Sequence, residues 1–388
     1  QMLIDSSSCF LLPPDLTPEQ QKKIYELREA VADLLAEQPH QDTPFVLLRW
    51  LIGNNYNVEE AATRFAFALE TLRLIRRPSP PMSSAEDVNN FVSTINQFAD
   101  YYPGGVLGVD GEGDVLYVQA AGRIHPRSLM RAGAVAELFQ FTIAEADAVH
   151  ALVRHQERRS GRKSGLKLII DLDGLSTELL YAPALKIYMN ALTLLQRLFP
   201  DLGKSIVVMN APLLMNAAYA MLSSVLAEET RVKIRFISST SSPKQQKQQL
   251  REVLGDEKLL KLLEDRTYGG IVRPGGLVPD SLIYQPSEFD NAAQMQTLSV
   301  PARSSRRVVV AGQKGRRIRW LWRVSSGDVD FHIERGSRLV WPRFRISTEC
   351  CPEHDSLLCS DDDSYEFVFD NSHGRFFAKN ILYRIELE

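Results

Sequence analysis

Three short apolar runs give the chain its clearest hydrophobic pattern. They cover residues 166–171, 205–210 and 232–237, and the segments between them have the length and the period of helices. Strands that alternate with helices predict an α/β domain with a largely parallel sheet. The connection after the second run, residues 211–227, contains no charged residue. A helix there needs apolar contact on nearly all sides, so it either lies deep in a core or covers an apolar surface that is not protein.

The N-terminal part of the chain has a helical pattern. Thr17 followed by Pro18 is typical of a helix start, and the helix is expected to run to about residue 37. A second helix is predicted around residues 45–51, where the sequence is almost entirely apolar. A third helix begins after Asn57, with apolar residues at helical spacing.

A proline-rich stretch at residues 76–81 ends this group of helices. A β-hairpin is expected next, with strands at residues 106–109 and 115–118 joined by a turn of Asp and Gly residues. Two helices lead from the hairpin to the parallel strands. Beyond those strands, the heavily charged residues 244–263 predict one more helix.

The pattern changes in the last third of the chain. Apolar and polar residues there alternate with period two, which is typical of antiparallel strands with one buried face in a β-sandwich. The segment from Pro274 to about Val300 is interpreted as a linker. Strands are predicted at residues 308–310, 318–324, 329–333, 365–369 and 381–385.

The length of 388 residues exceeds that of one ordinary domain. The predicted elements divide the chain into a helical module over residues 13–80, an α/β domain over residues 81–273 and an all-β sandwich over residues 274–388. Apolar residues make up 44% of the chain, so large cores are available. The net charge of −3 gives no general attraction to nucleic acid, and no nucleic-acid partner is expected.

Cysteine usage and hydropathy indicate in which cellular compartment the protein is expected. No apolar run reaches the roughly 20 residues that a membrane-spanning helix needs. The first residues lack the basic and apolar regions of a secretory signal, so none is expected. Of the four cysteines, Cys9 stands alone, while Cys350, Cys351 and Cys359 form a cluster. Three clustered thiols do not make a disulfide framework, and a reduced cytoplasmic protein is predicted.

A search for motifs of catalysis finds none. The chain has no nucleophile elbow, no His-Glu-x-x-His motif and no Walker-type phosphate loop. The three clustered cysteines with His354 fit no spacing of a tetrahedral zinc site, and residues 361–363 are interpreted as a solvated acidic turn. We therefore predict neither an enzyme nor a metal site.

Several short motifs carry a family resemblance. They are LLRWL at residues 47–51, VEEA at 58–61, IDLDGL at 170–175, FPD at 199–201, NAP at 210–212, LAEETR at 226–231, YGG at 268–270, FDNS at 369–372 and AK at 378–379. With these motifs in this order, nearly the whole chain resembles Sec14-like proteins in which a CRAL-TRIO lipid-binding domain is followed by a GOLD domain. The domain order is similar to the branch of supernatant protein factor, which is tied to tocopherol, squalene and phospholipid handling.

The resemblance implies that the charge-free helix, residues 213–226, is a mobile gate over a lipid pocket. The residue pattern agrees, because a helix that is apolar on two faces can pack on a lipid when closed and on a membrane when open. In this family Asp171 and Asp173 are structural, although α/β enzymes place acids where such strands end. The expected pocket residues lie on the hairpin, the strands, the helix after the first parallel strand, and the gate: Tyr117, Leu166, Leu168, Ile170, Leu185, Tyr188, Met189, Val207, Met209, Leu214, Ala218, Met221, Leu222, Val225, Ile234 and Phe236.

Departures from the family pattern bear on the headgroup of the lipid. Members that hold phosphatidylcholine use small hydroxyl residues where this chain has Leu166 and Leu168. Phosphoinositide-binding members use an acid that is matched by Asp201 and a lysine that is matched by Lys247, or less closely by Lys244. Asp201 and Lys247 are therefore the expected headgroup contacts.

Residues 52–55 read Ile-Gly-Asn-Asn where the family usually has basic residues, which favours a neutral ligand. The resemblance predicts a non-enzymatic protein that binds one lipid in a gated pocket and transfers or presents it between membranes. The ligand is a phospholipid, a phosphoinositide or a tocopherol-like or isoprenoid-like molecule. No cofactor beyond this lipid is expected. The protein is expected in the cytoplasm, with peripheral and transient membrane association, in membrane trafficking.

The sandwich leaves alternatives open. Residues 303–323 hold eight basic residues and no acid, with Trp320 and Trp322 among them. Such a segment can dock an anionic membrane or form an ordinary solvated face. The GOLD-like sandwich is also a candidate surface for a protein partner, and the alternative to lipid transfer is an adaptor or signalling protein with a vestigial pocket. A filled core beneath the gate favours the adaptor, whereas an apolar cavity of several hundred Å³ favours the carrier.

Overall fold

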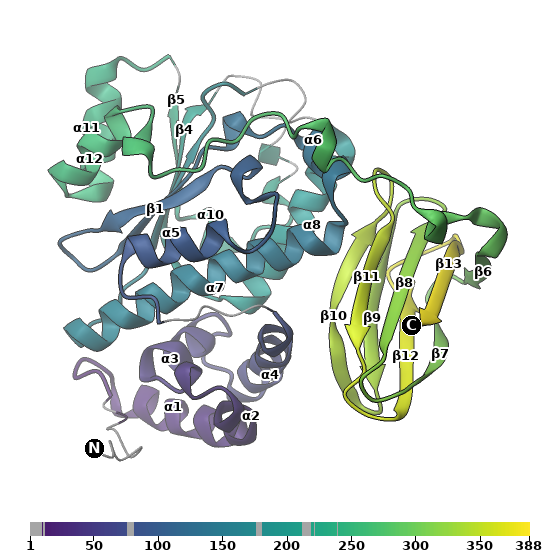
Figure 1. The fold of residues 1–388 in the computed structure, drawn as a ribbon. Coiled ribbons are helices and arrows are strands. Elements are labelled where there is room, and N and C mark those ends of the chain that lie inside the picture. Colours follow the sequence, from purple (N-terminus) through teal and green to yellow (C-terminus); the bar gives the residue numbers. More distant parts are fainter. Residues whose placement is uncertain are drawn as a thin grey trace, which may run out of the picture.

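The computed structural model shows three parts that lie side by side (Figure 1). A group of N-terminal helices lies below an α/β part, and a β-sandwich lies beside them. This arrangement is the predicted fold class: helical region, α/β core with a parallel sheet, and antiparallel sandwich. The structure describes residue 10 and residues 12–75, 81–175, 181–211, 219–220, 222–238 and 240–388.

The N-terminal helices follow the sequence prediction except at one break. The helix predicted over residues 18–37 is two helices, because Val31 leaves the helical conformation with φ −119° and ψ 19°. Thr17 caps the first helix, since its hydroxyl accepts a hydrogen bond from the amide of Gln20. The helices of this region are α1 (Pro18–Ala30), α2 (Ala32–Glu37), α3 (Pro44–Ile52) and α4 (Val58–Leu74).

Helix α3 lies at the centre of this group. Every residue from Phe45 to Leu51 is buried, including the charged Arg49. Trp50 stacks on Phe65 of α4, with ring centroids 4.8 Å apart. A helix that is apolar on nearly all sides must be covered on all sides, and α3 is therefore enclosed by its neighbours.

One five-stranded sheet organises the α/β part, in the order β1-β2-β3-β4-β5. β1 and β2 form the predicted hairpin and pair antiparallel. From β2 to β5 every pairing is parallel, which confirms the predicted parallel sheet. The strands are β1 (Gly104–Val109), β2 (Val115–Gln119), β3 (Leu166–Asp171), β4 (Gly203–Ala211) and β5 (Ile234–Ser238).

Helices cover both faces of this sheet (Figure 1). α6, α7 and α8 lie on one face; on the other, Leu250 of α11 packs in one cluster with Ile169 of β3. The single helix predicted over residues 244–263 is two helices, because Gly255 adopts φ 64° and Asp256 caps the second. None of the described helices is long and apolar enough to cross a bilayer. The helices of the α/β part are α5 (Ala85–Ser93), α6 (Pro126–Ala132), α7 (Val135–Ser160), α8 (Ala182–Leu198), α10 (Glu228–Arg231), α11 (Pro243–Leu254) and α12 (Glu257–Glu264).

The C-terminal part is a sandwich of two antiparallel sheets, in the orders β10-β9-β12-β7 and β11-β8-β13-β6. Three strands lie outside the sequence prediction. β6 falls in the segment interpreted as a linker, β11 follows the cysteine pair, and β10 contains Pro342, which an edge strand tolerates. The strands are β6 (Gln296–Val300), β7 (Ser305–Gly312), β8 (Arg317–Val324), β9 (Asp328–Arg335), β10 (Arg338–Ser347), β11 (Glu353–Leu358), β12 (Asp363–Asp370) and β13 (Lys379–Leu387).

The tryptophans of the basic segment lie inside the sandwich. Trp320 and Trp322 of β8 are fully buried, and each packs on Phe331 of the facing sheet. Arg317 and Arg319, which alternate with them along the strand, are on the outer face. The structure therefore favours a solvated sandwich face for strand β8 over a membrane-docking one.

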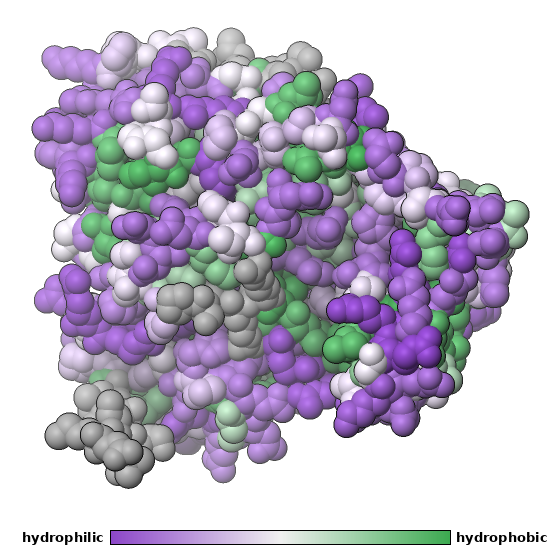
Figure 2. All heavy atoms as spheres, viewed as in Figure 1, coloured by the Kyte–Doolittle hydropathy of each residue, from purple (hydrophilic) through white to green (hydrophobic). Residues whose placement is uncertain are grey.

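The sandwich contacts the helices that lie beside it through an ion pair and an aromatic contact. Lys186 of α8 forms an ion pair with Asp328 of β9 at 3.0 Å. Phe344 of β10 meets Phe139 of α7 edge on, with ring centroids 5.5 Å apart. Figure 2 shows hydrophobic side chains at this junction and hydrophilic ones over most of the outer surface of the sandwich.

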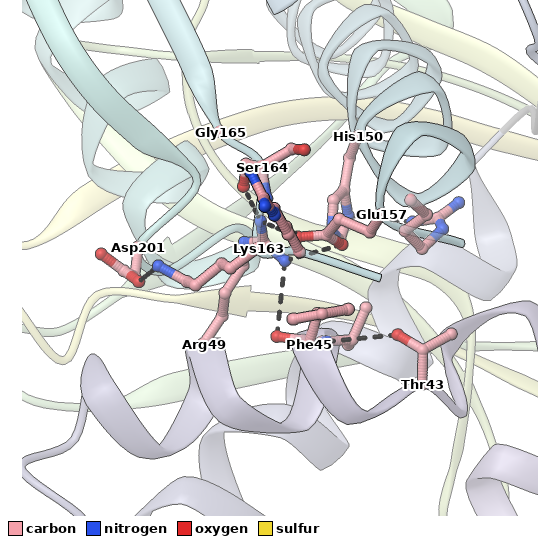
Figure 3. Close-up of polar contacts among 12 residues, drawn as sticks. Thr43, Phe45, Arg49, His150, Glu157, Lys163, Ser164, Gly165 and Asp201 are labelled. Carbon is pink, nitrogen blue, oxygen red and sulfur yellow. Dashed lines mark hydrogen bonds and ion pairs between the residues drawn. The ribbon is translucent and has the colours of Figure 1, made fainter. Parts of the chain in front are cut away.

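A buried ion pair joins the N-terminal helices to the α/β part (Figure 3). Arg49 of α3 and Glu157 of α7 are each 2% exposed, and Nη2 of the arginine lies 2.6 Å from Oε1 of the glutamate. The same guanidinium group donates to the carbonyl oxygen of Ser164, and Glu157 accepts a hydrogen bond from the Ser164 amide at 3.0 Å. Because Ser164 lies two residues before β3, the pair also fixes the start of that strand.

Glu157→Ala should lower the free energy of unfolding by about 3–5 kcal/mol, because it leaves the buried Arg49 without its carboxylate. Urea unfolding of the variant and the native chain measures the difference. The matched control is the double variant Arg49→Met/Glu157→Met, which removes both charges and should recover most of the loss. A loss below about 1 kcal/mol for Glu157→Ala would contradict the role of the pair.

His150 of α7 lies beside this ion pair (Figure 3). Its Nδ1 accepts a hydrogen bond from Arg154 Nη1 at 2.9 Å, so the neutral ring carries its proton on Nε2. Burial, and then the positive charges of Arg154 and Arg49, hold the pKa of His150 well below its usual value. The folded protein therefore keeps a neutral imidazole at a pH at which the unfolded chain protonates it.

His150→Gln should reduce the loss of stability in mild acid. The folded state binds this proton less readily than the unfolded chain, so His150 costs stability as the pH falls below about 6.5, by about 1.4 kcal/mol at pH 5.5. Glutamine keeps an acceptor for Arg154 and does not titrate. Between pH 7.5 and 5.5 the free energy of unfolding should thus fall by about 1.4 kcal/mol less in the variant. An equal fall in both proteins, measured by urea titration, would show that the expectation is wrong.

Candidate functional site

A large apolar cavity lies between the parallel strands and the helices α6, α7 and α8. Its volume is about 370 Å³, which is within the range of small-molecule binding sites. β3, β4 and β5 form its floor, and the three helices form its walls. Part of the remaining side is lined by Tyr219, Leu222, Leu226, Glu229, Thr230 and Lys233. The cavity occupies the place where the sequence predicts a lipid pocket.

Alternate residues of the three parallel strands form the floor. Leu168 of β3 is in register with Ile206 of β4, which is in register with Ile234 of β5. Residues paired in this way point to the same face of the sheet, and the next row on that face follows two residues later. The floor consists of Leu166, Leu168, Ile170, Ile206, Val208, Ile234 and Phe236.

Helix α8 forms the wall opposite the floor. One face of this helix, at intervals of three and four residues, carries Leu185, Tyr188, Leu192 and Leu195 toward the cavity. Burial raises the pKa of Tyr188 above its usual value, as expected for a phenol in apolar surroundings. Residues of α6 and α7 complete the walls, among them Leu129, Met130, Leu138, Phe139 and Thr142.

The described part of the predicted gate lies against the cavity. Tyr219, Leu222 and Leu226 line it, and the Tyr219 ring meets Phe236 of the floor edge on at 4.9 Å. Val225, also predicted to contact the lipid, is not among the described lining residues. The remaining predicted gate residues, Leu214, Ala218 and Met221, lie outside the described residues.

One end of the cavity is polar. The Asp201 carboxylate pairs with Lys163 Nζ at 2.5 Å and with Lys233 Nζ at 3.1 Å, and Lys233 also donates to the carbonyl oxygen of Gly203 at 2.8 Å. Burial alone would raise the pKa of Asp201, but the two lysines hold it below its usual value. Glu229 also faces this end, and burial raises its pKa. The ionic groups here are largely paired with one another.

Two predicted floor residues, Val207 and Met209, lie on the opposite face of the sheet. They belong to the apolar cluster that includes Leu250 of α11. Helices cover both faces of β4, so residues 206–209 are all apolar and their sequence does not say which face a residue takes. The cavity residues of this strand, which the sequence analysis missed, are Ile206 and Val208.

Two further predicted pocket residues do not line the cavity. Tyr117 of β2 is buried and donates a hydrogen bond to Glu145 Oε1 at 2.6 Å, so its hydroxyl is held by α7. Met189 follows Tyr188 on α8 and falls outside the helix face that meets the cavity. No residue of β2 is among the described lining residues, whereas α8 borders the cavity through other residues than Met189.

The predicted headgroup lysine, Lys247, lies elsewhere. It is on α11, on the other face of the sheet, and pairs with Glu264 at 2.6 Å. The lysine beside Asp201 is Lys233. Asp201 lies just before β4 and Lys233 just before β5, and the starts of neighbouring parallel strands meet at one edge of the sheet. That spacing is the signal that could have identified Lys233.

Conspicuous acids outside the cavity have structural partners. Asp171 at the end of β3 accepts hydrogen bonds from Tyr268 Oη and, at 2.7 Å, from Asn210 Nδ2. Within the described part of the chain, one group of acids is close enough to share a metal ion; its members are Asp110, Glu112 and Asp114. These acids form ion pairs with Lys167 and Lys204.

Comparisons with known proteins agree with this geometry. The family model of the CRAL/TRIO domain matches residues 99–270. Protein real-time of Drosophila melanogaster is 24% identical over 306 residues, which cover 77% of this chain and 44% of that protein. Protein real-time of Aedes aegypti is 23% identical over 222 residues, which cover 57% of this chain and 33% of that protein. The chain thus spans less than half the length of these curated relatives.

The solved structures include a weak likeness. The crystal structure of Sfh5 superposes with a TM-score of 0.43 at 13% identity and covers 57% of this chain and 81% of that chain.

Proposed function

We propose that the protein binds one hydrophobic lipid and transfers or presents it between membranes, and the match of residues 99–270 to the family model of the CRAL/TRIO domain supports this proposal. The observation that carries the proposal is the apolar cavity of about 370 Å³ that Tyr219, Leu222 and Leu226 border. An adaptor with a vestigial pocket would have a filled core there, so the cavity favours the carrier.

Exchange requires a balance between cavity and bilayer. Burial of an acyl chain of about 16 carbons is worth about 13 kcal/mol, and a bilayer offers nearly the same. A cavity with apolar floor and walls can therefore match the bilayer without holding the lipid irreversibly. In this proposal the segment that carries Tyr219, Leu222 and Leu226 moves aside at a membrane, one lipid exchanges, and the segment closes again.

The polar end of the cavity favours a ligand with a small, uncharged polar group. Lys163 and Lys233 are already paired with Asp201, so a phosphate headgroup would have to compete with this carboxylate. Leu166 and Leu168 offer no hydroxyl to a choline lipid. We therefore favour a neutral ligand of the tocopherol or isoprenoid kind over a phosphoinositide or another phospholipid.

The wider role is part of the same proposal. We assign the protein to the cytoplasm, with transient contact with membrane surfaces and no cofactor beyond the lipid. The sandwich, which has the two antiparallel sheets expected of a GOLD domain, is the proposed surface for a protein partner or for membrane docking.

Ala191→Phe tests the cavity directly. Ala191 of α8 lines the cavity, and a phenyl ring in its place occupies the space of the ligand. Loading of a fluorescent lipid from liposomes should fall by about tenfold or more, because a loss of about 1.4 kcal/mol of binding is a tenfold change. The variant should melt no lower than the lipid-free native chain, since the new side chain fills an apolar space that is otherwise empty.

The matched control is Ala311→Phe, which adds the same ring at an exposed position of β7. It should load lipid like the native chain. If Ala191→Phe also loads normally, the ligand does not occupy this cavity and the proposed function loses its main support.

Lys233→Ala distinguishes a neutral ligand from an anionic one. A neutral lipid does not need this cation, so its loading should change by less than about threefold. The exposed Lys244→Ala, on the other face of the sheet, is the control. Loading of each variant is measured with a tocopherol and with a phosphoinositide. If Lys233→Ala lowers loading of the phosphoinositide by tenfold or more and leaves loading of the tocopherol unchanged, the ligand is anionic and not neutral.

A further inference from the structure

The loop between β12 and β13 presents two adjacent phenylalanines to solvent. Phe376 is 81% exposed and Phe377 is 79% exposed, the highest values among the large apolar residues that the structure describes. Exposed apolar side chains on a soluble surface usually occur singly. Two neighbouring rings at one loop tip therefore indicate a surface that is buried against a binding partner when the protein functions.

The loop holds these rings in place through a buried asparagine. Asn371, which is 3% exposed, donates from Nδ2 to the carbonyl oxygen of Phe377 at 3.0 Å and to that of Val300 at 3.2 Å. The Gly374 amide donates to the Asn371 carbonyl at 2.9 Å, and a Cβ on this glycine would lie 2.3 Å from Asn371 Oδ1. The loop is thus pre-shaped, which lowers the entropic cost of binding through its tip.

Cations without acidic partners surround the two rings. Arg375 precedes them, Lys379 follows them, and the Arg303 amide donates to the Asn371 carbonyl at 3.0 Å. None of these three cations forms an ion pair with a described residue. In contrast, the acids at this end of the sandwich have basic partners at 3.0, 3.1 and 3.8 Å; they are Asp328, Asp330 and Asp370.

The loop lies at the end of the sandwich that meets the cavity wall. Lys379 Nζ donates to the Ser326 carbonyl at 2.8 Å, which ties the loop to the turn before β9. Asp328, at the start of β9, pairs with Lys186 of α8 at 3.0 Å. The adjacent residues Leu185 and Ile187 of α8 line the cavity. A surface reached by the loop is therefore next to the helix that borders the lipid site.

We propose that residues 371–378 dock the protein on an anionic lipid bilayer. The two phenyl rings enter the interface between headgroups and acyl chains, and the three cations lie above it against anionic headgroups. The combination of an apolar tip with unpaired cations matches such a bilayer better than a protein groove, where cations would need specific acids. This inference rests on the proposed function for the reason why a bilayer is met, but docking itself needs no ligand in the cavity.

Phe376→Ser/Phe377→Ser should weaken docking of the full chain by about 100-fold, or about tenfold for each ring. The measurement is co-sedimentation with vesicles of phosphatidylcholine containing phosphatidylserine, compared with vesicles of phosphatidylcholine alone. The matched control is Val309→Ser/Leu358→Ser, which removes two apolar residues that are 60% and 54% exposed elsewhere on the sandwich. The control should bind like the native chain.

Arg375→Ala separates the electrostatic contribution. It should weaken binding to the anionic vesicles by about fivefold at low salt, and the difference should vanish at high salt. The exposed Lys314→Ala is its control. The proposal is overturned if the native chain does not sediment with anionic vesicles, if the phenylalanine variant binds as tightly as the native chain, or if the control loses binding equally.

The two proposals fail separately. A loop variant that still carries lipid and misses vesicles confirms docking through the loop, whereas a native chain that docks and carries no lipid contradicts the proposed function alone. Ala191→Phe should dock normally. A loss of docking in that variant would mean that docking depends on the cavity rather than on the loop.

Discussion

An unfilled apolar space is the constraint on which the rest of this molecule depends. Apolar side chains that face an unfilled space of about 370 Å³ lose the packing contacts that a close-packed core would give them. The helix face that begins at Leu185 and the floor that begins at Leu166 could have been closed by larger side chains. A ligand that supplies the missing contacts explains why they are not.

The walls of such a cavity need support from outside. Phe139 lines the cavity on one side of α7 and meets Phe344 of the sandwich, so the sandwich backs the wall directly. Lys186 ties the neighbouring helix to the same sandwich. On the other side, Arg49 and Glu157 fix the far end of α7 to the N-terminal helices. The floor and walls are thus braced from two sides, which is compatible with the proposed movement of the segment that carries Tyr219, Leu222 and Leu226.

The fold class could be predicted because each part of the chain has its own period. The cavity could be predicted only in part. β4 is apolar on both faces, so nothing in its sequence separates Val207 from Val208. The helix breaks at Val31 and Gly255 depend on one residue each within a continuous helical pattern. The edge strand β10 was not predicted because it contains Pro342, and proline usually argues against a strand. The direction of a side chain and the pairing of distant elements depend on contacts in the folded chain, so the sequence pattern alone did not reveal them.

Native mass spectrometry of the purified full chain, with solvent extraction of anything bound, decides whether the cavity holds a lipid. We expect one lipid per chain, of neutral type, whose removal lowers the melting temperature and whose return restores it. A chain that is free of lipid as purified, stays free after incubation with mixed liposomes and melts at the same temperature throughout would contradict lipid binding in this cavity.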